Sequence, residues 1–480
     1  MSQEWIYTIV FLAWLIGAAC FVLGLHFMNS PATAKDGNRL SAAGMVVAVV
    51  TTLAYLFTRE GGLSGAAIAI IVVGFLIGGG IGLYLARTVK MTAMPQLVSL
   101  FNAVGGGAAA LVAIDDYVRV VGTPGESLST TLFVVLGVVI GCVTFTGSLI
   151  AGGKLQGLID GRPIVVPGGR LVTLVLAVVA VAGLVVLLLG AYGSIDLDST
   201  AKLAVLALVI AAALIFGVTM VLPIGGADMP VVISLLNSFT GTAAAMAGFV
   251  ISNPVLIISG ALVGASGGIL TKLMADAMNR SILNIIAGGF GGGEGVMAAG
   301  GGPGGSVREI GVDDAAIQLA YAQNVIVVPG YGLAVAQAQH AVRELAEQLE
   351  ARGVNVTYAI HPVAGRMPGH MNVLLAEANV PYPQLKEMED VNPEFDRADV
   401  ALVVGANDVT NPAARRPGTP VSGMPILDVD HAKSIIVIKR SMAAGYAGID
   451  NELYYNPKTG MLFADAKQGL AGLTAAVKAL

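Results

Sequence analysis

The segment Val325-Ile-Val-Val-Pro-Gly-Tyr-Gly-Leu-Ala-Val335 decides the fold of the C-terminal part of the chain. A run of β-branched residues enters a glycine-containing turn, and an apolar pattern of helical period follows it. Strand, tight turn and helix in this order open a βαβ unit of a parallel sheet. Gly330 and Gly332 let a phosphate group approach the backbone at the start of a helix, and Val335 stands where a third glycine is usual. The segment therefore predicts the first turn of a nucleotide-binding sheet.

The residues that follow repeat this alternation. Short β-branched runs predict strands at 324–328, 355–360, 400–404 and 434–438, and periodic apolar positions predict helices at 334–352 and 371–379. Strands separated by helices form a parallel, doubly wound sheet. We therefore expect a soluble α/β Rossmann-like domain over residues 307–480.

The N-terminal part has a different composition. Charged residues make up only 12% of the whole chain, which has 63 glycines and a mean hydropathy of +0.80, as is typical of polytopic membrane proteins. Apolar runs long enough to cross a bilayer, roughly 20 residues each, lie near 5–28, 40–58, 63–86, 94–114, 128–151, 171–190, 203–222, 229–250 and 254–275. We expect an all-α membrane domain of about nine transmembrane helices over residues 1–286, and a flexible glycine-rich linker over 287–306.

The loop charges predict the orientation of these spans. One side carries Lys35, Arg39, Arg87, Lys90, Lys154, Arg162, Arg170, Lys272 and Arg280, and the other carries Arg59, Arg119 and Lys202. Cytoplasmic loops are rich in Lys and Arg. The N-terminus is therefore expected outside the membrane and the soluble domain in the cytoplasm.

The membrane domain contains an internal repeat. Met94-Pro-Gln-Leu-Val-Ser-Leu-Phe-Asn102 recurs 135 residues later as Met229-Pro-Val-Val-Ile-Ser-Leu-Leu-Asn237, and each copy continues into a Gly- and Ala-rich run. The two segments are spans four and eight, so they share one orientation, as in a parallel repeat. Each asparagine lies eight residues beyond its methionine, about 12 Å along a helix.

Polar residues inside spans are functional candidates. Asn102 and Asn237 either line a polar pathway or join helices by hydrogen bonds. Asp228 directly precedes span eight and is either an N-cap, with Pro230 in the first turn, or a proton-transfer group. Ser266 and Arg280 are weaker candidates, because a small packing residue and a positively charged anchor explain them equally well.

Two further segments in the soluble part suggest a ligand. The second predicted strand runs into Ile360-His361-Pro362 without the acid that usually meets the ribose of NAD. Lys439-Arg440-Ser441 instead follows a strand, where two cations and a hydroxyl suit a 2′-phosphate, or form a solvated charge pair.

Gly405-Ala-Asn407-Asp408, at the end of another strand, offers polar groups for a ribose or a nicotinamide ring. No Ser-His-Asp set and no metal-ligand cluster stands out in the sequence. Cys20 and Cys142 both lie in apolar runs, so we expect no disulfide framework. No basic patch suggests nucleic acid.

Taken together, these motifs resemble one family along essentially the whole chain. The soluble motifs are 330–339, 361–378, 405–408, 439–442 and Gly445-Tyr446-Ala-Gly448, and the membrane motifs are 225–232 and 277–281. They are similar to the β subunit of proton-translocating nicotinamide nucleotide transhydrogenases, with its membrane domain and NADP(H)-binding domain.

The resemblance implies hydride exchange between NADP(H) here and NAD(H) on a partner, coupled to proton movement across a bacterial cytoplasmic membrane. The cofactor-binding residues it implies are Gly330, Tyr331, Gly332, Val335, Asn407, Asp408, Lys439, Arg440, Ser441, Gly445 and Tyr446. Asp408 would lie at the nicotinamide end. The implied proton path or its gate includes Asp228, Asn237, Ser266, Arg280 and Asn102.

The resemblance also implies partners. We expect an α-type subunit that carries the NAD(H)-binding domain and additional transmembrane helices, and a dimer of the full complex in membrane lipid. Many relatives have histidine at the position of Asn102, and the only histidine of this membrane part is His26. We hypothesise that a helix of the partner supplies the missing imidazole.

The architecture alone also fits a channel or transporter whose soluble domain senses a nucleotide without converting it. The Lys439–Ser441 segment and the full-length resemblance favour the transhydrogenase. A membrane-anchored dehydrogenase is disfavoured, because an anchor needs one span rather than about nine.

Overall fold

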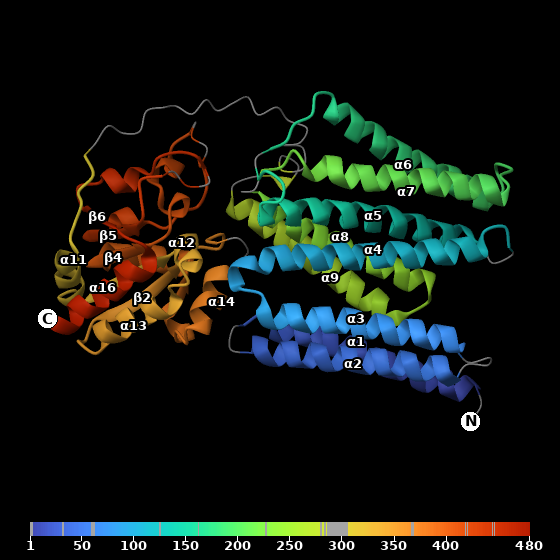
Figure 1. Ribbon diagram of the computed structural model, residues 1–480, viewed down its shortest axis with the longest axis horizontal. Helices are drawn as coiled ribbons and strands as arrows, with labels where there is room; N and C mark the ends of the chain where they lie inside the picture. Colours follow the sequence, from blue (N-terminus) through green and yellow to red (C-terminus); the bar gives the residue numbers. More distant parts are fainter. Residues whose placement is uncertain are drawn as a thin grey trace. The chain divides into compact units, whose positions relative to one another are not determined.

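A computed structural model describes residues 3–30, 33–58, 63–123, 126–161, 163–225, 228–278, 281–282, 285, 306–365, 369–417, 419, 421–443, 445 and 447–480 (Figure 1). The chain divides into two compact units, Met1–Thr271 and Lys272–Leu480. The predicted linker lies outside the described residues except for Ser306. The domain limits at 286 and 306 therefore stay predictions.

Among the described residues, nine helices are long and apolar enough to span a membrane. They are α1 (Gln3–Phe27), α2 (Ala34–Thr58), α3 (Gly65–Thr88), α4 (Met94–Val120), α5 (Leu128–Gln156), α6 (Gly169–Tyr192), α7 (Ser199–Val221), α8 (Met229–Val250) and α9 (Pro254–Ala277). The nine predicted spans are thus confirmed. Several helices, α4 among them, continue past the apolar run, because backbone hydrogen bonding does not stop where polar side chains begin.

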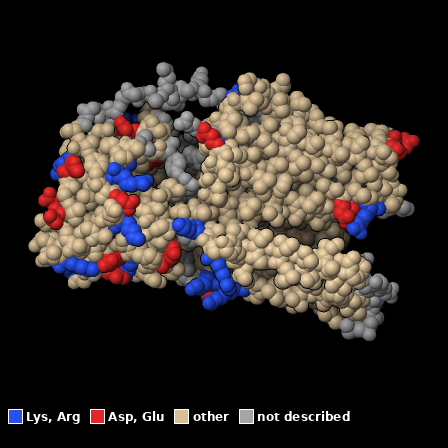
Figure 2. All heavy atoms as spheres, viewed as in Figure 1, with Lys and Arg blue, Asp and Glu red and all other residues tan. Residues whose placement is uncertain are grey.

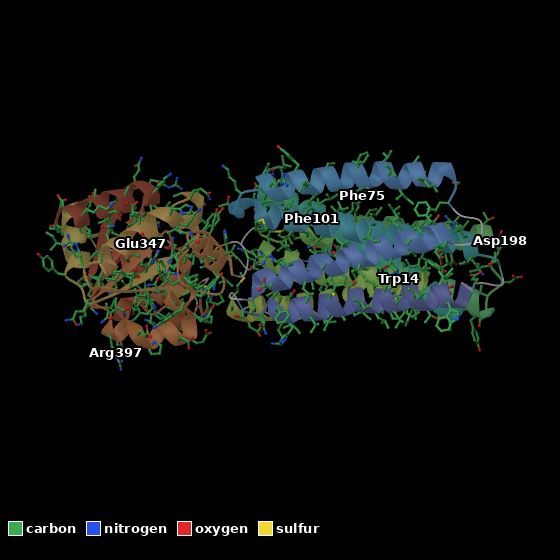
Figure 3. All side chains as sticks on the ribbon, turned by 90° about the horizontal axis from the view of Figure 1, so that it is seen from below. Trp14, Phe75, Phe101, Asp198, Glu347 and Arg397 are labelled. Atoms are coloured by element: carbon green, nitrogen blue, oxygen red, sulfur yellow. The ribbon has the colours of Figure 1, made fainter. Side chains whose placement is uncertain are left out.

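Apolar side chains cover the outside of this unit. Phe75 on α3 is 69% exposed, whereas Trp14 on α1 is 6% exposed and donates its Nε1–H to Thr52 on α2 (Figure 3). On the face shown in Figure 2, the charged side chains of this unit lie toward the helix ends. An exposed apolar belt of this kind is what contact with lipid requires.

The second unit is built on a six-stranded sheet of order β3-β2-β1-β4-β5-β6, with every pairing parallel. The strands are β1 (Asn324–Pro329), β2 (Asn355–Ile360), β3 (Leu385–Glu387), β4 (Val400–Val404), β5 (Ser434–Lys439) and β6 (Thr459–Phe463). The doubly wound prediction is confirmed. The sequence did not predict β3, which has three residues, or β6, which contains Gly460.

The prediction of a single helix over 334–352 is wrong. The chain forms α12 (Tyr331–Val335) and α13 (Gln339–Glu350), which are separated at Gln337, where φ is +51°. A left-handed residue ends a right-handed helix. The predicted helix near 371 is confirmed as α14 (His370–Glu377).

The two faces of the sheet are covered differently. Helices α11 (Val312–Ala320), α13 and α16 (Ala466–Ala479) pack together beside the sheet (Figure 1). In a buried core cluster, strand residues such as Ile326, Val403 and Val437 pack against short segments. These segments are α15 (Met388–Val391), η3 (Asn392–Arg397), η6 (Val429–His431) and η7 (Glu452–Tyr455). Tyr454 of η7 belongs to this cluster.

Candidate functional site

The turns after β1 and β4 touch at the carboxyl edge of the sheet. These strands are neighbours, and the strand order changes direction between them, which is where ligands bind in doubly wound sheets. Gly330 N–H donates to Val404 O at 3.0 Å, and Gly332 N–H donates to Gly405 O at 2.9 Å.

Glycine is required on both sides of this contact. A Cβ on Gly330 would lie 2.4 Å from Ala406 Cα, and one on Gly332 would lie 2.7 Å from Gly405 Cα. Gly405 itself has φ of +69°, a conformation that favours glycine. The two glycines of the Gly-Tyr-Gly turn are therefore needed for close contact with the turn after β4. The sequence did not predict this contact.

Asp408 is covered by the chain that follows β5. A Cβ on Gly445 would lie 2.4 Å from Asp408 Oδ1, and Ala447 N–H donates to Asp408 Oδ2 at 3.0 Å. The two predicted site residues Asp408 and Gly445 are thus brought together, although 37 positions separate them in the chain.

Two asparagines also join the chain after β4 to the chain after β5. Asn451 Nδ2 donates to Asn407 O at 2.9 Å and to Thr410 Oγ1 at 3.1 Å. Asn411 Nδ2 donates to Asp450 O at 3.0 Å. Both asparagine side chains are buried, so these bonds fix the turn after β4 against the chain after β5. Sequence reasoning missed both residues.

Lys439 ends β5 beside this turn. Its Nζ donates to Ala443 O at 2.5 Å and lies 4.8 Å from the centre of the Tyr454 ring. Burial lowers the pKa of Lys439, and the carboxylates of Asp408 and Asp450 oppose that shift. A partly buried ammonium group can donate charge-assisted hydrogen bonds to an anionic ligand group at this position.

The remaining predicted residues are placed less centrally. Arg440 and Ser441 are exposed, and Ser441 Oγ accepts from Ala443 N–H at 3.5 Å. Val335 is 46% exposed at the end of α12. The Tyr331 ring lies 6.5 Å from that of His370. Tyr446 lies outside the described residues.

His361, directly after β2, joins its own loop to the segment around Pro425 by hydrogen bonds. Its Nδ1 accepts from Val363 N–H at 3.2 Å, so Nε2 carries the proton and donates to Pro425 O at 2.7 Å. Burial lowers the pKa of His361 to about 4. The side chain is therefore a neutral structural group near neutral pH.

The two copies of the membrane repeat form the same contacts. Ser99 on α4 donates to Ser148 O on α5 at 2.7 Å, and Ser234 on α8 donates to Gly267 O on α9 at 3.2 Å. Glycines repeat the pattern. A Cβ on Gly106 would lie 3.1 Å from Gly141 O on α5, and one on its counterpart Gly241 would lie 2.4 Å from Gly264 N on α9.

The copies also pack on each other. Asn102 Nδ2 donates to Ile233 O at 3.2 Å, and Thr240 Oγ1 donates to Asn102 O at 3.3 Å. A Cβ on Gly105 would lie 2.9 Å from Thr240 Cγ2, and Ala109 packs on Ala243 one turn later. Contacts that advance together along both helices make α4 and α8 parallel. Asn102 therefore joins helices, as one of its two interpretations requires.

The other membrane candidates are more scattered. Asp228 is at the N-cap position of α8, but its side chain does not cap the helix. Asn237 is half-buried on the same helix. Ser266 Oγ donates to Val263 O of its own helix at 3.3 Å. Arg280 lies outside the described residues.

Two lysines counted as loop charges are buried instead. Lys154 on α5 is 4% exposed and donates to Leu222 O and, at 2.7 Å, to Ile224 O, at the end of α7. Lys202 on α7 pairs with Glu126 at 2.9 Å, with side chains 9% and 6% exposed. A lysine can be buried where carbonyls or a carboxylate accept its hydrogen bonds.

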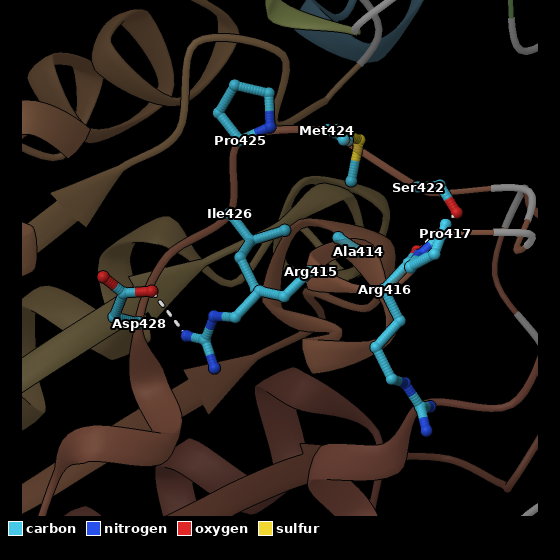
Figure 4. A pocket seen from close by; sticks show the side chains of 10 residues that line it. Ala414, Arg415, Arg416, Pro417, Ser422, Met424, Pro425, Ile426 and Asp428 are labelled. Carbon is cyan, nitrogen blue, oxygen red and sulfur yellow. Dashed lines mark hydrogen bonds and ion pairs between the residues drawn. The ribbon is translucent and has the colours of Figure 1, made fainter.

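A cavity of about 630 Å³ lies elsewhere in the second unit, lined by Ala414–Pro417, Ser422–Ile426 and Asp428 (Figure 4). None of the predicted site residues lines it. Asp428, Asp430 and His431 also lie close enough together to hold a metal ion. Arg415 donates to Asp428 at 2.5 Å and to Asp430 at 2.6 Å, so both carboxylates already pair with one cation.

The fold and the site define an integral membrane protein with apolar spanning helices and a doubly wound domain whose carboxyl edge carries glycine turns, a carboxylate and a lysine. Residues 10–476 match the family model of the NAD(P) transhydrogenase beta subunit, and the chain belongs to this family. The chain is 49% identical over 463 residues to the NAD(P) transhydrogenase subunit beta of Rhodospirillum rubrum, which covers 95% of this chain and 96% of the relative. A sequence from a defined strain of that species matches equally. The resemblance seen in the sequence is confirmed.

Proposed function

We propose that this chain is the NADP(H)-binding subunit of a proton-translocating transhydrogenase. The observation that carries the proposal is Lys439, a partly buried cation at the carboxyl edge of the sheet in a chain of this family. The bound nucleotides supply the chemistry, in which a hydride passes between NAD(H) on the partner and NADP(H) on this chain.

The residues at the carboxyl edge suit a dinucleotide. Gly330, Gly332 and Gly405 bring two turns into backbone contact and leave no side chain between them. In the proposal Lys439, with Arg440 and Ser441 at the exposed rim, holds the 2′-phosphate. Tyr331, Val335, Asn407, Gly445 and Tyr446 complete the binding surface.

Asp408 has a separate proposed role. Its carboxylate is bonded by Ala447 N–H in the segment that follows Lys439. A change in the charge of a bound nicotinamide would act directly on this carboxylate, because opposite charges attract strongly at short range. We assign Asp408 to the link between redox state and protonation.

In the membrane unit, Asp228 is the proposed proton carrier. The proposed path also includes Asn102, Asn237, Ser266 and Arg280. Amides and hydroxyls can relay hydrogen bonds but do not titrate near neutral pH, whereas a carboxylate can take up and release a proton. Since Asn102 is not a histidine, an imidazole on a partner helix completes the path.

The proposal includes the setting of the protein. The chain works in a bacterial cytoplasmic membrane with its N-terminus outside and its nucleotide domain in the cytoplasm. An α subunit brings the NAD(H)-binding domain and additional spans, and the complete complex is a dimer.

Calorimetric titration of the full chain in detergent with NADP⁺ and with NAD⁺ tests the nucleotide assignment. We expect strong preference for NADP⁺, reduced at least tenfold (about 1.4 kcal/mol) by Lys439→Ala. Equal binding of the two nucleotides would contradict the assignment.

Reconstitution of the chain with its α subunit in vesicles tests the reaction and its coupling. We expect NADH to reduce NADP⁺ with movement of protons across the membrane. Nucleotide binding without hydride exchange would instead favour a nucleotide-sensing transporter. Proton pumping by a complex with no titratable side chain near Asn102 would contradict the partner-imidazole hypothesis.

A further inference from the structure

Tyr454 lies beneath the candidate nucleotide site, in a position that none of the sequence motifs includes. It belongs to η7, which follows β5 and the segment that covers Asp408. The side chain is 2% exposed and packs in the core cluster with Leu453 and Met461. A tyrosine buried this deeply has its ring orientation fixed by packing.

The hydroxyl of Tyr454 reaches the turn after β4. It lies 3.0 Å from Asn407 Oδ1 and 3.2 Å from Ala406 O, and its single proton is shared between these two acceptors. Burial raises the pKa of Tyr454 well above its usual value, so the hydroxyl keeps its proton. The tyrosine therefore holds both the backbone and the amide side chain that directly precede Asp408.

The face of the same ring carries Lys439. Its Nζ lies 4.8 Å from the ring centre, within the range of a cation–π interaction. The attraction is stronger where the cation is partly removed from water, as Lys439 is. One rigid side chain thus contacts both the lysine at the end of β5 and the turn at the end of β4.

We propose that Tyr454 is a positioning residue that sets the selectivity of the site for nucleotides with a 2′-phosphate. Its ring keeps the Lys439 ammonium at the phosphate position, and its hydroxyl keeps Asn407 and Asp408 in their binding geometry. The inference rests on the proposed function, in which Lys439 recognises the 2′-phosphate.

The two contacts make separable predictions. Tyr454→Phe keeps the ring under Lys439 and removes only the hydroxyl, so it weakens NADP⁺ and NAD⁺ binding to the same extent, roughly fivefold. Tyr454→Leu also removes the ring, so it weakens NADP⁺ binding by roughly a further tenfold and leaves NAD⁺ binding near the Phe value. The ratio of the two dissociation constants therefore changes only in the Leu variant.

The experiment is calorimetric titration of the full chain in detergent with NADP⁺ and with NAD⁺, for the wild type and both Tyr454 variants. Tyr358→Phe is the matched control, because Tyr358 is a fully buried tyrosine on β2, away from Lys439 and Asn407, which end and follow other strands. We expect this control to bind both nucleotides as the wild type does. Lys439→Ala, measured alongside, tests the proposed function itself.

Wild-type affinities for both nucleotides in Tyr454→Phe would overturn the role of the hydroxyl, even if Tyr454→Leu does not fold. An unchanged affinity ratio in a folded Tyr454→Leu would overturn the role of the ring. If Lys439→Ala keeps the NADP⁺ preference, the phosphate assignment has failed. If Lys439→Ala loses that preference and the Tyr454 variants keep wild-type binding, only the present inference has failed.

Discussion

Ser99 on α4 and Ser234 on α8 occupy equivalent positions of the membrane repeat, and each donates its hydroxyl to a carbonyl of the helix that follows. Gly106 and Gly241 are equivalent too, and each lies against that same following helix. The position before the repeat differs, since α4 has Ala93 where α8 has Asp228. The copies therefore share the residues that join helices and differ in the residue that can titrate.

The difference between the two copies separates helix packing from chemistry. A polar group that occurs in both copies and in each copy bonds the helix that follows is explained by helix association, which small and hydroxyl residues support in membranes. Asp228 has no such counterpart, so packing symmetry does not explain it. Among the proposed path residues it is the one most directly open to a functional test.

The largest expected effect comes from Asp228→Asn. The amide keeps the size of the side chain but cannot carry a proton, so we expect proton-coupled hydride transfer by the reconstituted complex to fall roughly 10²-fold. The matched change at the equivalent position, Ala93→Asn, is expected to leave the rate within about twofold. Similar losses in both variants would show that the position matters only for the start of the helix.

A titratable group outside the repeat gives the second prediction. Burial lowers the pKa of His361 from 6.5 to about 4. Between these values the unfolded chain binds a proton that the folded domain does not, so the contribution of His361 to stability is full above about pH 6.5 and falls as the pH drops toward 4. The loss reaches about 3 kcal/mol.

Differential scanning calorimetry of the full chain at pH 7, 5.5 and 4.5 measures this loss in the transition of the nucleotide domain. His361→Gln has no imidazole to protonate and is expected to flatten most of the pH dependence. A transition equally pH-dependent in both proteins would assign the effect to other groups. The result sharpens the comparison of the two repeat copies, because it separates proton uptake by His361 in the soluble unit from any proton transfer by Asp228.

The shared glycines give the third prediction. A Cβ on Gly241 would lie 2.4 Å from the backbone nitrogen of Gly264, whereas one on Gly106 would lie 2.8 Å from the side-chain Cβ of Thr144. We therefore expect alanine to destabilise the membrane unit by about 3 kcal/mol at Gly241 and by about 1 kcal/mol at Gly106. Gly78→Ala on α3 is the control, because no atom from outside its own stretch of helix backbone lies within 4 Å of that Cβ position.

Unfolding of the three glycine variants by a denaturing detergent measures these differences. A Gly241→Ala variant as stable as the Gly78→Ala control would contradict the close approach of α8 and α9.

The smallest expected effect concerns the serines. Ser99→Ala and Ser234→Ala each remove one interhelical hydrogen bond and are expected to cost about 1 kcal/mol in the same unfolding assay. Both variants should retain coupled activity, because the bonds serve helix packing. Loss of activity in only one of them would give that copy a role beyond packing and weaken the symmetry.

The sequence predicted most of the fold because its patterns are local. The β-branched runs of β1, β2, β4 and β5 and the apolar spans stand out in any short window. The helical pattern over 334–352 gave no sign of the left-handed Gln337, since glutamine is an ordinary helix former. β6 was missed because Gly460 interrupts its pattern.

The site was predictable only in part, since much of it depends on contacts between distant segments. Lys439 ends β5 and Asp408 follows β4, and parallel strands end at one edge, so their proximity could be expected. Tyr454 and Asn451 follow a loop of no clear pattern, and only the folded chain brings them to Asn407. The burial of Lys154 and Lys202 could not be predicted either, because their partners come from distant segments. A lysine near the end of an apolar run looks like a solvated loop charge in the sequence.

The parallel course of α4 and α8 has a consequence for the ancestry of the membrane unit. The interval of 135 residues between the copies contains four crossings, and an even number of crossings returns the chain to the side from which it started. A gene segment of this length could therefore be duplicated in tandem without turning its second copy upside down. The second copy would then meet the same lipid and the same aqueous phases as the first.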